Sequence, residues 1–141
     1  MPSRADIVAT ARGFLGTPYM HLQRNQRFMD CVGLVIAVAR EHGLGDYLRE
    51  DYARIPDPAH MEKNLRDRMD AINPSTARPG DIYWISFAGT PRHVGIIGDH
   101  PSGAQSLIHA YAEAKKVVEH RIDKKWQRRI CGAFSYRGVT D

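Results

Sequence analysis

The chain has 141 residues, 43% of them hydrophobic and 26% charged, with a formal net charge of +4 at pH 7. This balance is typical of a globular protein and excludes a disordered or fibrous class, and the length suits one domain over residues 1–141. The small positive excess is compatible with an anionic partner such as cell wall, nucleic acid or a lipid surface, and it selects none of them.

Neither the cysteines nor the hydropathy indicates a disulfide framework, a leader or a membrane segment. Cys31 and Cys131 are the two cysteines, and they allow at most one disulfide. Residues 1–16 are amphipathic and lack the continuous apolar core of a signal peptide, and no segment approaches the roughly 20 apolar residues of a membrane span. We therefore expect a protein made in the cytoplasm without a signal peptide and without membrane insertion.

The first expected element is a helix that Ser3 caps, with Asp6 at the third helical position as in a capping box. Its apolar residues recur at helical spacing and form one face: Ile7, Val8, Ala11, Phe14 and Leu15. Gly16 ends this helix, and Pro18 prevents its continuation. The following residues, 17–30, are expected to form a loop.

The second expected helix, residues 30–42, is apolar on almost every side until Arg40, which is typical of a buried helix. Gly43 provides its C-terminal stop. Residues 44–58 have no clear periodicity, and a third, more polar helix is predicted over residues 60–72.

The second half of the chain has the pattern of a sheet. Five short runs rich in β-branched and aromatic residues are separated by turn residues: 81–87, 93–99, 105–111, 116–122 and 130–137. Such close spacing favours antiparallel pairing over crossover connections. Helices followed by strands indicate an α+β fold, with N-terminal helices packed on a mostly antiparallel sheet of five to six strands.

Cys31 stands at the start of the second expected helix, directly after Asp30. A thiol there is close to unpaired N–H groups and to the positive end of the helix dipole, which favour the reactive thiolate. The alternative is a buried structural thiol, because free cysteine is among the most buried residue types. Cys131 lies in an apolar, strand-like run, and we interpret it as a core residue.

A nucleophilic cysteine needs a base, and the base needs an orienting group. Among the seven histidines, His93 begins one expected strand and His109 lies within the next. Neighbouring antiparallel strands would bring the two imidazoles side by side, so that one takes the thiol proton and the other fixes its tautomer. The alternative for His109 is a satisfied core histidine. Four others are interpreted as solvated: His42, His60, His100 and His120.

Six segments resemble, in order, motifs of the NlpC family of bacterial and phage cell-wall cysteine peptidases, which have a papain-like fold. They are ARGFLGTPY (11–19), DCVGLV (30–35), RPGDIYWI (78–85), HVGIIGD (93–99), LIHAY (107–111) and GAFSYR (132–137). The resemblance spans nearly the whole chain. It implies a papain-like NlpC-type domain in which Cys31 is the nucleophile, His93 the general base and His109 the orienting third residue.

The resemblance also implies two substrate-binding residues and a reaction. Tyr19 would direct its hydroxyl into the cleft near the nucleophile, and Asp30 would help to recognise the substrate's amine or the adjoining backbone. The implied enzyme is a cysteine peptidase that hydrolyses peptidoglycan stem peptides through an acyl-enzyme, often between D-γ-glutamate and a diamino acid. Amidase activity also occurs among relatives. No metal and no cofactor are expected.

The sequence departs from the family pattern at Val32, where the family usually has serine, so substrate contacts that depend on that serine are in question. Residues 44–72 match no family motif and are candidates for a specificity or docking region. The short, signal-less form resembles the phage tail-associated or gene-transfer-agent branch. In that setting the partners would be bacterial peptidoglycan and tail-tip proteins, and the enzyme would act at the cell wall as a virion component.

Two other functions are compatible with the sequence. A structural or adaptor component of a phage tail tip would keep the same fold with little or no turnover. The segment KKWQRR (124–129) has the composition to hold phosphates and stack a base, but a solvated loop edge with Trp126 packed inward is favoured, so no nucleic-acid partner is expected. A metal site is not expected either, because the chain has no HExxH and no CxxC motif.

Overall fold

The computed structural model describes residues 1–20, 30–44 and 58–141, and its helices precede most of its strands. The elements are α1 (Arg4–Arg12), α2 (Cys31–Glu41), α3 (Pro58–Arg68), β1 (Asp70–Ile72), the 3-10 helix η1 (Pro74–Thr76), β2 (Ile82–Phe87), β3 (Thr90–Asp99), β4 (Gln105–Tyr111), β5 (Lys116–Arg121), α4 (Lys124–Gln127) and β6 (Ile130–Ser135). The α+β fold class predicted from the sequence is confirmed.

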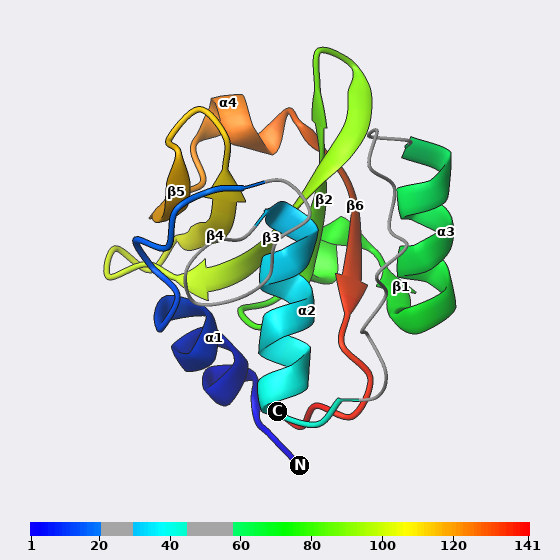
Figure 1. Ribbon diagram of the computed structural model, residues 1–141, viewed down its shortest axis with the longest axis vertical. Helices are drawn as coiled ribbons and strands as arrows, with labels where there is room; N and C mark the ends of the chain where they lie inside the picture. Colours follow the sequence, from blue (N-terminus) through cyan, green and yellow to red (C-terminus); the bar gives the residue numbers. More distant parts are fainter. Residues whose placement is uncertain (21–29, 45–57) are drawn as a thin grey trace.

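The strands form a six-stranded sheet in the order β1-β6-β2-β3-β4-β5, and every neighbouring pair is antiparallel. Side chains alternate between two hydrophobic layers, as the two-residue period of a strand requires. One layer joins Trp84, Ile96 and Ile108 to α1 and α2, which lie in front of the sheet in Figure 1. In the other layer, Tyr83 and Leu107 belong to the same hydrophobic cluster as Trp126 of α4.

Local signals explain where α1 and α2 begin. Ser3 accepts from the N–H of Asp6, and the Asp6 carboxylate accepts from the N–H of Ser3, so the expected capping box is present. The helix ends earlier than expected, at Arg12, and Leu15 is 43% exposed. Asp30 caps α2, of which every residue from 33 to 39 is buried.

The interior position of α2 follows from its composition. A helix that is apolar all round is stabilised mainly by burial, and α2 packs against β3 and β4. The Tyr136 hydroxyl donates to the Val35 carbonyl at 2.7 Å and ties the chain after β6 to the middle of the helix. None of the helices in the described ranges combines the length and the apolarity needed to cross a bilayer.

Two expectations about local structure were wrong. The third helix ends at Arg68, and residues 70–72 form the edge strand β1 paired with β6. Arg137 explains this end, because its guanidinium donates to the carbonyls of Asp67 and Met69 and pairs with the Asp70 carboxylate, which satisfies carbonyls at the end of α3.

Cys131 is exposed and is not a core residue. The ladder between β2 and β6 pairs Trp84 with Gly132 and Ile85 with Ile130, so Cys131 is the extra residue of a β-bulge. A bulged residue does not follow the strict alternation of a strand. Apolar neighbours in the sequence therefore do not indicate that Cys131 is buried.

The fold leaves a tight space at Gly95 on β3. A Cβ at this position would lie 2.6 Å from Leu107 Cδ1 and 3.1 Å from His109 Cβ. We expect Gly95→Ala to lower the free energy of unfolding by about 1–3 kcal/mol, because β4 must move to accept the methyl group. Urea unfolding measures this change, and an unchanged midpoint would show that the strands have more room than described.

Candidate active site

The start of α2 presents a thiol to the sheet. The Asp30 carboxylate accepts from the N–H of Gly33 at 2.7 Å and is only 3% exposed, which makes Cys31 the first residue of the helix. Cys31 as a whole residue is partly exposed, but its thiol is buried, and the N–H groups of Val94, Val32 and Cys31 itself are close enough to stabilise the thiolate. Val94 is the residue that follows His93 on β3, so the thiol lies beside this part of the strand.

Burial and a neighbouring charge oppose ionisation of this thiol. Removal from water and, to a smaller extent, the Asp30 carboxylate raise the pKa of Cys31 to about 12, against the lowering effect of the three N–H groups. The expectation that the helix start favours the thiolate is therefore outweighed in the folded chain. Cys31 is a neutral thiol at pH 7 and needs a partner that accepts its proton.

The structure brings His93 and His109 together. His93 Nε2 and His109 Nδ1 are 2.7 Å apart, and the two residues are 5% and 0% exposed. They lie diagonally across β3 and β4, and Gly95 leaves room for the His109 ring because it carries no side chain against it. Burial lowers the pKa of His93 to about 3 and that of His109 to about 2, with a smaller contribution from the neighbouring histidines. Both rings are neutral at pH 7.

A third histidine extends this pair, although the sequence analysis interpreted it as solvated. His120 Nε2 lies 2.8 Å from His109 Nε2, and His120 Nδ1 lies 3.0 Å from the carbonyl oxygen of Arg121. In β5, which pairs with β4, His120 and Val118 share one face of the strand, and Val118 lies opposite His109. In the sequence, the alternation of side chains along KVVEHRI places His120 on the same face as Val118. This points to His109 only once β5 is known to pair with β4.

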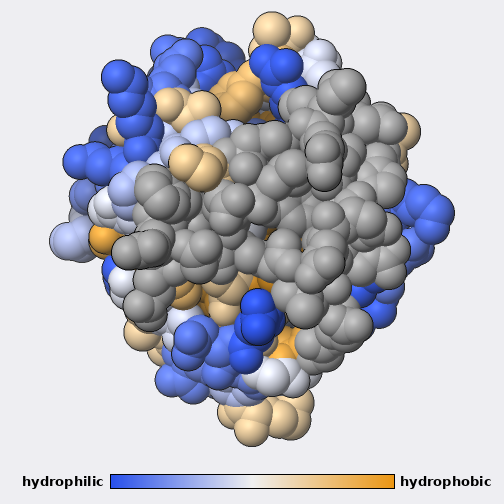
Figure 2. All heavy atoms as spheres, viewed as in Figure 1, coloured by the Kyte–Doolittle hydropathy of each residue, from blue (hydrophilic) through white to orange (hydrophobic). Residues whose placement is uncertain are grey.

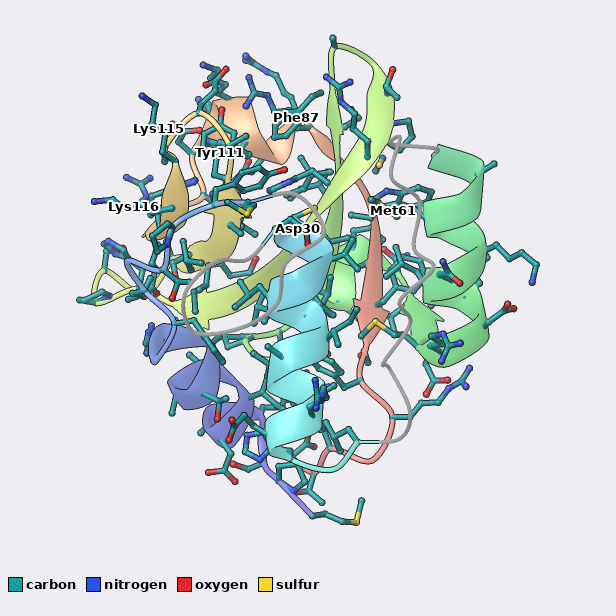
Figure 3. All side chains as sticks on the ribbon, viewed as in Figure 1. Asp30, Met61, Phe87, Tyr111, Lys115 and Lys116 are labelled. Carbon is teal, nitrogen blue, oxygen red and sulfur yellow. The ribbon has the colours of Figure 1, made fainter. Side chains whose placement is uncertain are left out.

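Aromatic side chains surround the three imidazoles. The His109 ring stacks on Tyr111 with centroids 5.0 Å apart, and Trp126 lies 5.1 Å from His109 and 4.9 Å from His120. Phe87 lies 5.0 Å from His93. Figure 3 shows Phe87 and Tyr111 beyond the end of α2 that Asp30 marks, and Figure 2 shows an apolar area between α4 and the β2–β3 hairpin, among hydrophilic side chains. This enclosure keeps water away from His93 and His109 and accounts for the lowered pKa values of these two rings.

Tyr19 also lies at the site. Its N–H donates to the Lys115 carbonyl at 2.9 Å, and Pro18 bridges to Lys116, so the segment after α1 is anchored on the start of β5. Burial, with smaller contributions from Cys31 and Asp30, raises the pKa of Tyr19 to about 12, which indicates that the phenol lies near both residues. The tyrosine therefore keeps its proton and can donate a hydrogen bond.

Of the remaining histidines, those that the structure describes lie away from this site. His42 bonds the Thr10 hydroxyl at 2.7 Å, and His100 bonds the hydroxyl of Ser102. His21 and the side chain of His60 lie outside the described residues, as do residues 45–57 of the candidate specificity region at 44–72. In the described part of the chain no three histidine, cysteine or acidic side chains are arranged to hold a metal ion.

Comparison with known proteins identifies this arrangement. The NlpC/P60 family profile matches residues 16–135, which include every segment described above from Tyr19 to β6. The chain belongs to the NlpC/P60 family. The resemblance stated from the sequence is confirmed, and so is the papain-like fold. No curated protein matches the chain significantly.

Solved structures of the NlpC/P60 family share this fold at low sequence identity. The NlpC/p60 domain of the peptidoglycan hydrolase SagA is 23% identical with a TM-score of 0.64, over 94% of this chain and 98% of that one. An NlpC/P60 family protein from Bacillus cereus is 19% identical with a TM-score of 0.72, over 96% of this chain and 40% of that one, so this chain spans less than half of its length. An N-acetylmuramoyl-L-alanine amidase from Bacteroides uniformis is 15% identical with a TM-score of 0.61, over 93% and 96%.

The two buried neutral rings should make stability depend on pH. In the unfolded chain each imidazole binds a proton below about pH 6.5, whereas in the folded chain His93 and His109 do not until about pH 3 and about pH 2. The unfolded state thus binds more protons in this window, and the free energy of unfolding falls as the pH falls, by up to about 1.4 kcal/mol per pH unit for each ring.

The contribution of one ring is measured with His109→Asn, which cannot titrate there. Urea unfolding of both proteins between pH 4 and pH 6.5 should give a shallower pH dependence for the variant, even though the variant is less stable throughout. Parallel curves would mean that His109 is already protonated when folded or does not titrate in the unfolded chain.

Proposed function

We propose that this protein is a cysteine peptidase that hydrolyses peptidoglycan stem peptides, of the type that cleaves between D-γ-glutamate and a diamino acid. The observation that carries the proposal is the 2.7 Å contact between His93 Nε2 and His109 Nδ1, on a strand whose next residue, Val94, directs its N–H to the Cys31 thiol. Membership of the NlpC/P60 family supports the same chemistry. The similar structures include a domain of a peptidoglycan hydrolase and an amidase, which supports a wall polymer as the substrate.

In this proposal Cys31 is the nucleophile, His93 the general base and His109 the orienting residue. His93 uses Nε2 for His109, so Nδ1 is the nitrogen available to accept the thiol proton. Because the thiol and the imidazole are both neutral at rest, proton transfer accompanies the attack of Sγ on the peptide carbonyl. The protonated His93 then gives its proton to the leaving amine, and water releases the acyl group with His93 again as the base.

The surroundings of the thiol suit the negative charge that develops on the carbonyl oxygen. The N–H groups at the start of α2 are available there because the first turn of a helix leaves them unpaired. Tyr19, whose raised pKa keeps the phenol protonated, is the proposed side-chain donor near this oxygen. Asp30 is proposed to attract the substrate's amine through its buried charge, in addition to capping α2.

The proposed setting is the cell wall, reached as part of a phage or gene-transfer-agent tail tip. The net charge of +4 suits an anionic wall polymer, and the tail-tip setting extends the resemblance to that branch of the family. Peptidoglycan and tail-tip proteins are the proposed partners. The competing proposal is an adaptor with the same fold and no turnover.

Digestion of purified peptidoglycan tests the proposal. The protein, Cys31→Ala and the matched control Cys131→Ala are incubated with several wall types, and the fragments are identified by mass spectrometry. Cys31→Ala should lower the rate by about 10³-fold or more, because it removes the nucleophile, while the exposed and bulged Cys131 should be replaceable without loss.

The fragment masses separate the alternatives. Cleavage after D-γ-glutamate supports the endopeptidase, and release of the whole stem peptide from the glycan supports an amidase. If the reduced protein gives no fragments from any wall type, the enzymatic proposal is wrong and the adaptor is favoured. Equal activity of Cys31→Ala would exclude Cys31 as the nucleophile.

A further inference from the structure

The three imidazoles form an unbranched chain that ends on a backbone carbonyl. His93 Nε2 lies 2.7 Å from His109 Nδ1, His109 Nε2 lies 2.8 Å from His120 Nε2, and His120 Nδ1 lies 3.0 Å from the Arg121 carbonyl oxygen. Each ring therefore uses one nitrogen toward each neighbour. Such a chain has only two possible directions of hydrogen-bond donation when all rings are neutral, since a neutral imidazole has one donor and one acceptor.

The carbonyl selects one of these directions. An amide oxygen can only accept, so His120 Nδ1 carries the hydrogen and His120 Nε2 has the lone pair. His109 Nε2 must then donate to His120, which leaves the lone pair of His109 on Nδ1. His93 Nε2 donates to it in turn, and the lone pair of His93 is on Nδ1. This is the nitrogen that has to accept the thiol proton.

Without His120 the direction would be open. In a pair of neutral histidines, His109 Nδ1 can donate to His93 Nε2 as well as accept from it, and both arrangements have one hydrogen bond. The first of them leaves a hydrogen on His93 Nδ1, which makes the ring unable to act as a base toward Cys31. The choice is important because His93 and His109 are buried, so water has little access to the bond between them.

We propose that His120 is a positioning residue that, through its bond to the Arg121 carbonyl, sets the tautomers of His109 and His93 so that His93 Nδ1 is the acceptor. The proposal rests on the proposed role of His93 as the base toward Cys31. His120 does not touch the reacting atoms and acts through His109. Trp126 holds the His120 ring in place, with centroids 4.9 Å apart, and is itself 9% exposed.

The same chain stabilises the charge that forms during the reaction. When His93 takes the thiol proton, its Nε2–H bond to His109 becomes charge-assisted and stronger. His109 polarises His120 in the same direction, and the Arg121 carbonyl dipole ends the series. A carboxylate could supply this effect directly, but here a series of imidazole rings and a backbone carbonyl does so.

Tautomer measurement tests the proposal without any turnover. Two-bond proton–nitrogen NMR spectra of the ¹⁵N-histidine-labelled protein at neutral pH distinguish the protonated nitrogen of each ring. We expect His93 and His109 to carry hydrogen on Nε2, and His120 on Nδ1. Hydrogen on Nδ1 of His93 or His109, or on Nε2 of His120, would overturn the proposal.

Two variants test the consequence for Cys31. His120→Phe keeps a ring against Trp126 and removes both hydrogen bonds, whereas His120→Gln offers one acceptor and one donor in the native order. In a Cys131→Ala background, the rate of Cys31 alkylation by iodoacetamide at pH 7 should fall about 10-fold or more in His120→Phe and recover to within about 3-fold in His120→Gln. Equal rates in all three proteins would overturn the positioning role.

Wall digestion separates this proposal from the proposed function. If peptidoglycan is cleaved, His120→Phe should lower kcat with little change in KM, because the substrate does not touch His120. If peptidoglycan is not cleaved but the tautomers and alkylation rates are as expected, the proposed substrate is wrong and the role of His120 stands. Cleavage together with the opposite tautomers would overturn the role of His120 alone.

Discussion

The packing of α2 along β3 and β4 is the constraint on which the site depends. Every residue of α2 from 33 to 39 is buried, so the helix can present polar chemistry only at its ends. Asp30 fixes the start of the helix, and Cys31 is consequently held beside the strand segment that contains His93 and Val94. The position of the thiol is thus a result of core packing.

Removal from water has opposite effects on the thiol and on the imidazoles. It raises the pKa of Cys31 and lowers the pKa of His93 and His109, so both sides of the site are neutral at pH 7. Burial thus disfavours an ion pair between thiolate and imidazolium in the folded chain. In the proposed mechanism, the direction of hydrogen bonding among the rings then decides whether His93 can accept a proton, which is the role proposed for His120.

In this family, a similar fold is formed by chains whose individual side chains differ. The solved relatives keep the architecture at 15 to 23% identity, which means that helix and strand patterns are maintained by packing and not by particular side chains. Val32 illustrates the difference, because it packs partly buried against the core layer that contains α2. Its side chain contributes to that layer at a position where the resemblance leads one to expect serine.

Local patterns in the sequence determined most of the elements. The capping box at Ser3, the apolar run after Asp30 and the alternation at residues 105–111 predicted α1, α2 and β4, and the order of motifs predicted the family. Only the tertiary structure decided the exposure of Cys131, the strand at 70–72, the neutral state of Cys31 and the place of His120. These depend on which strands pair, in which register, and on how much water is excluded, and such properties arise between segments that are distant in the sequence.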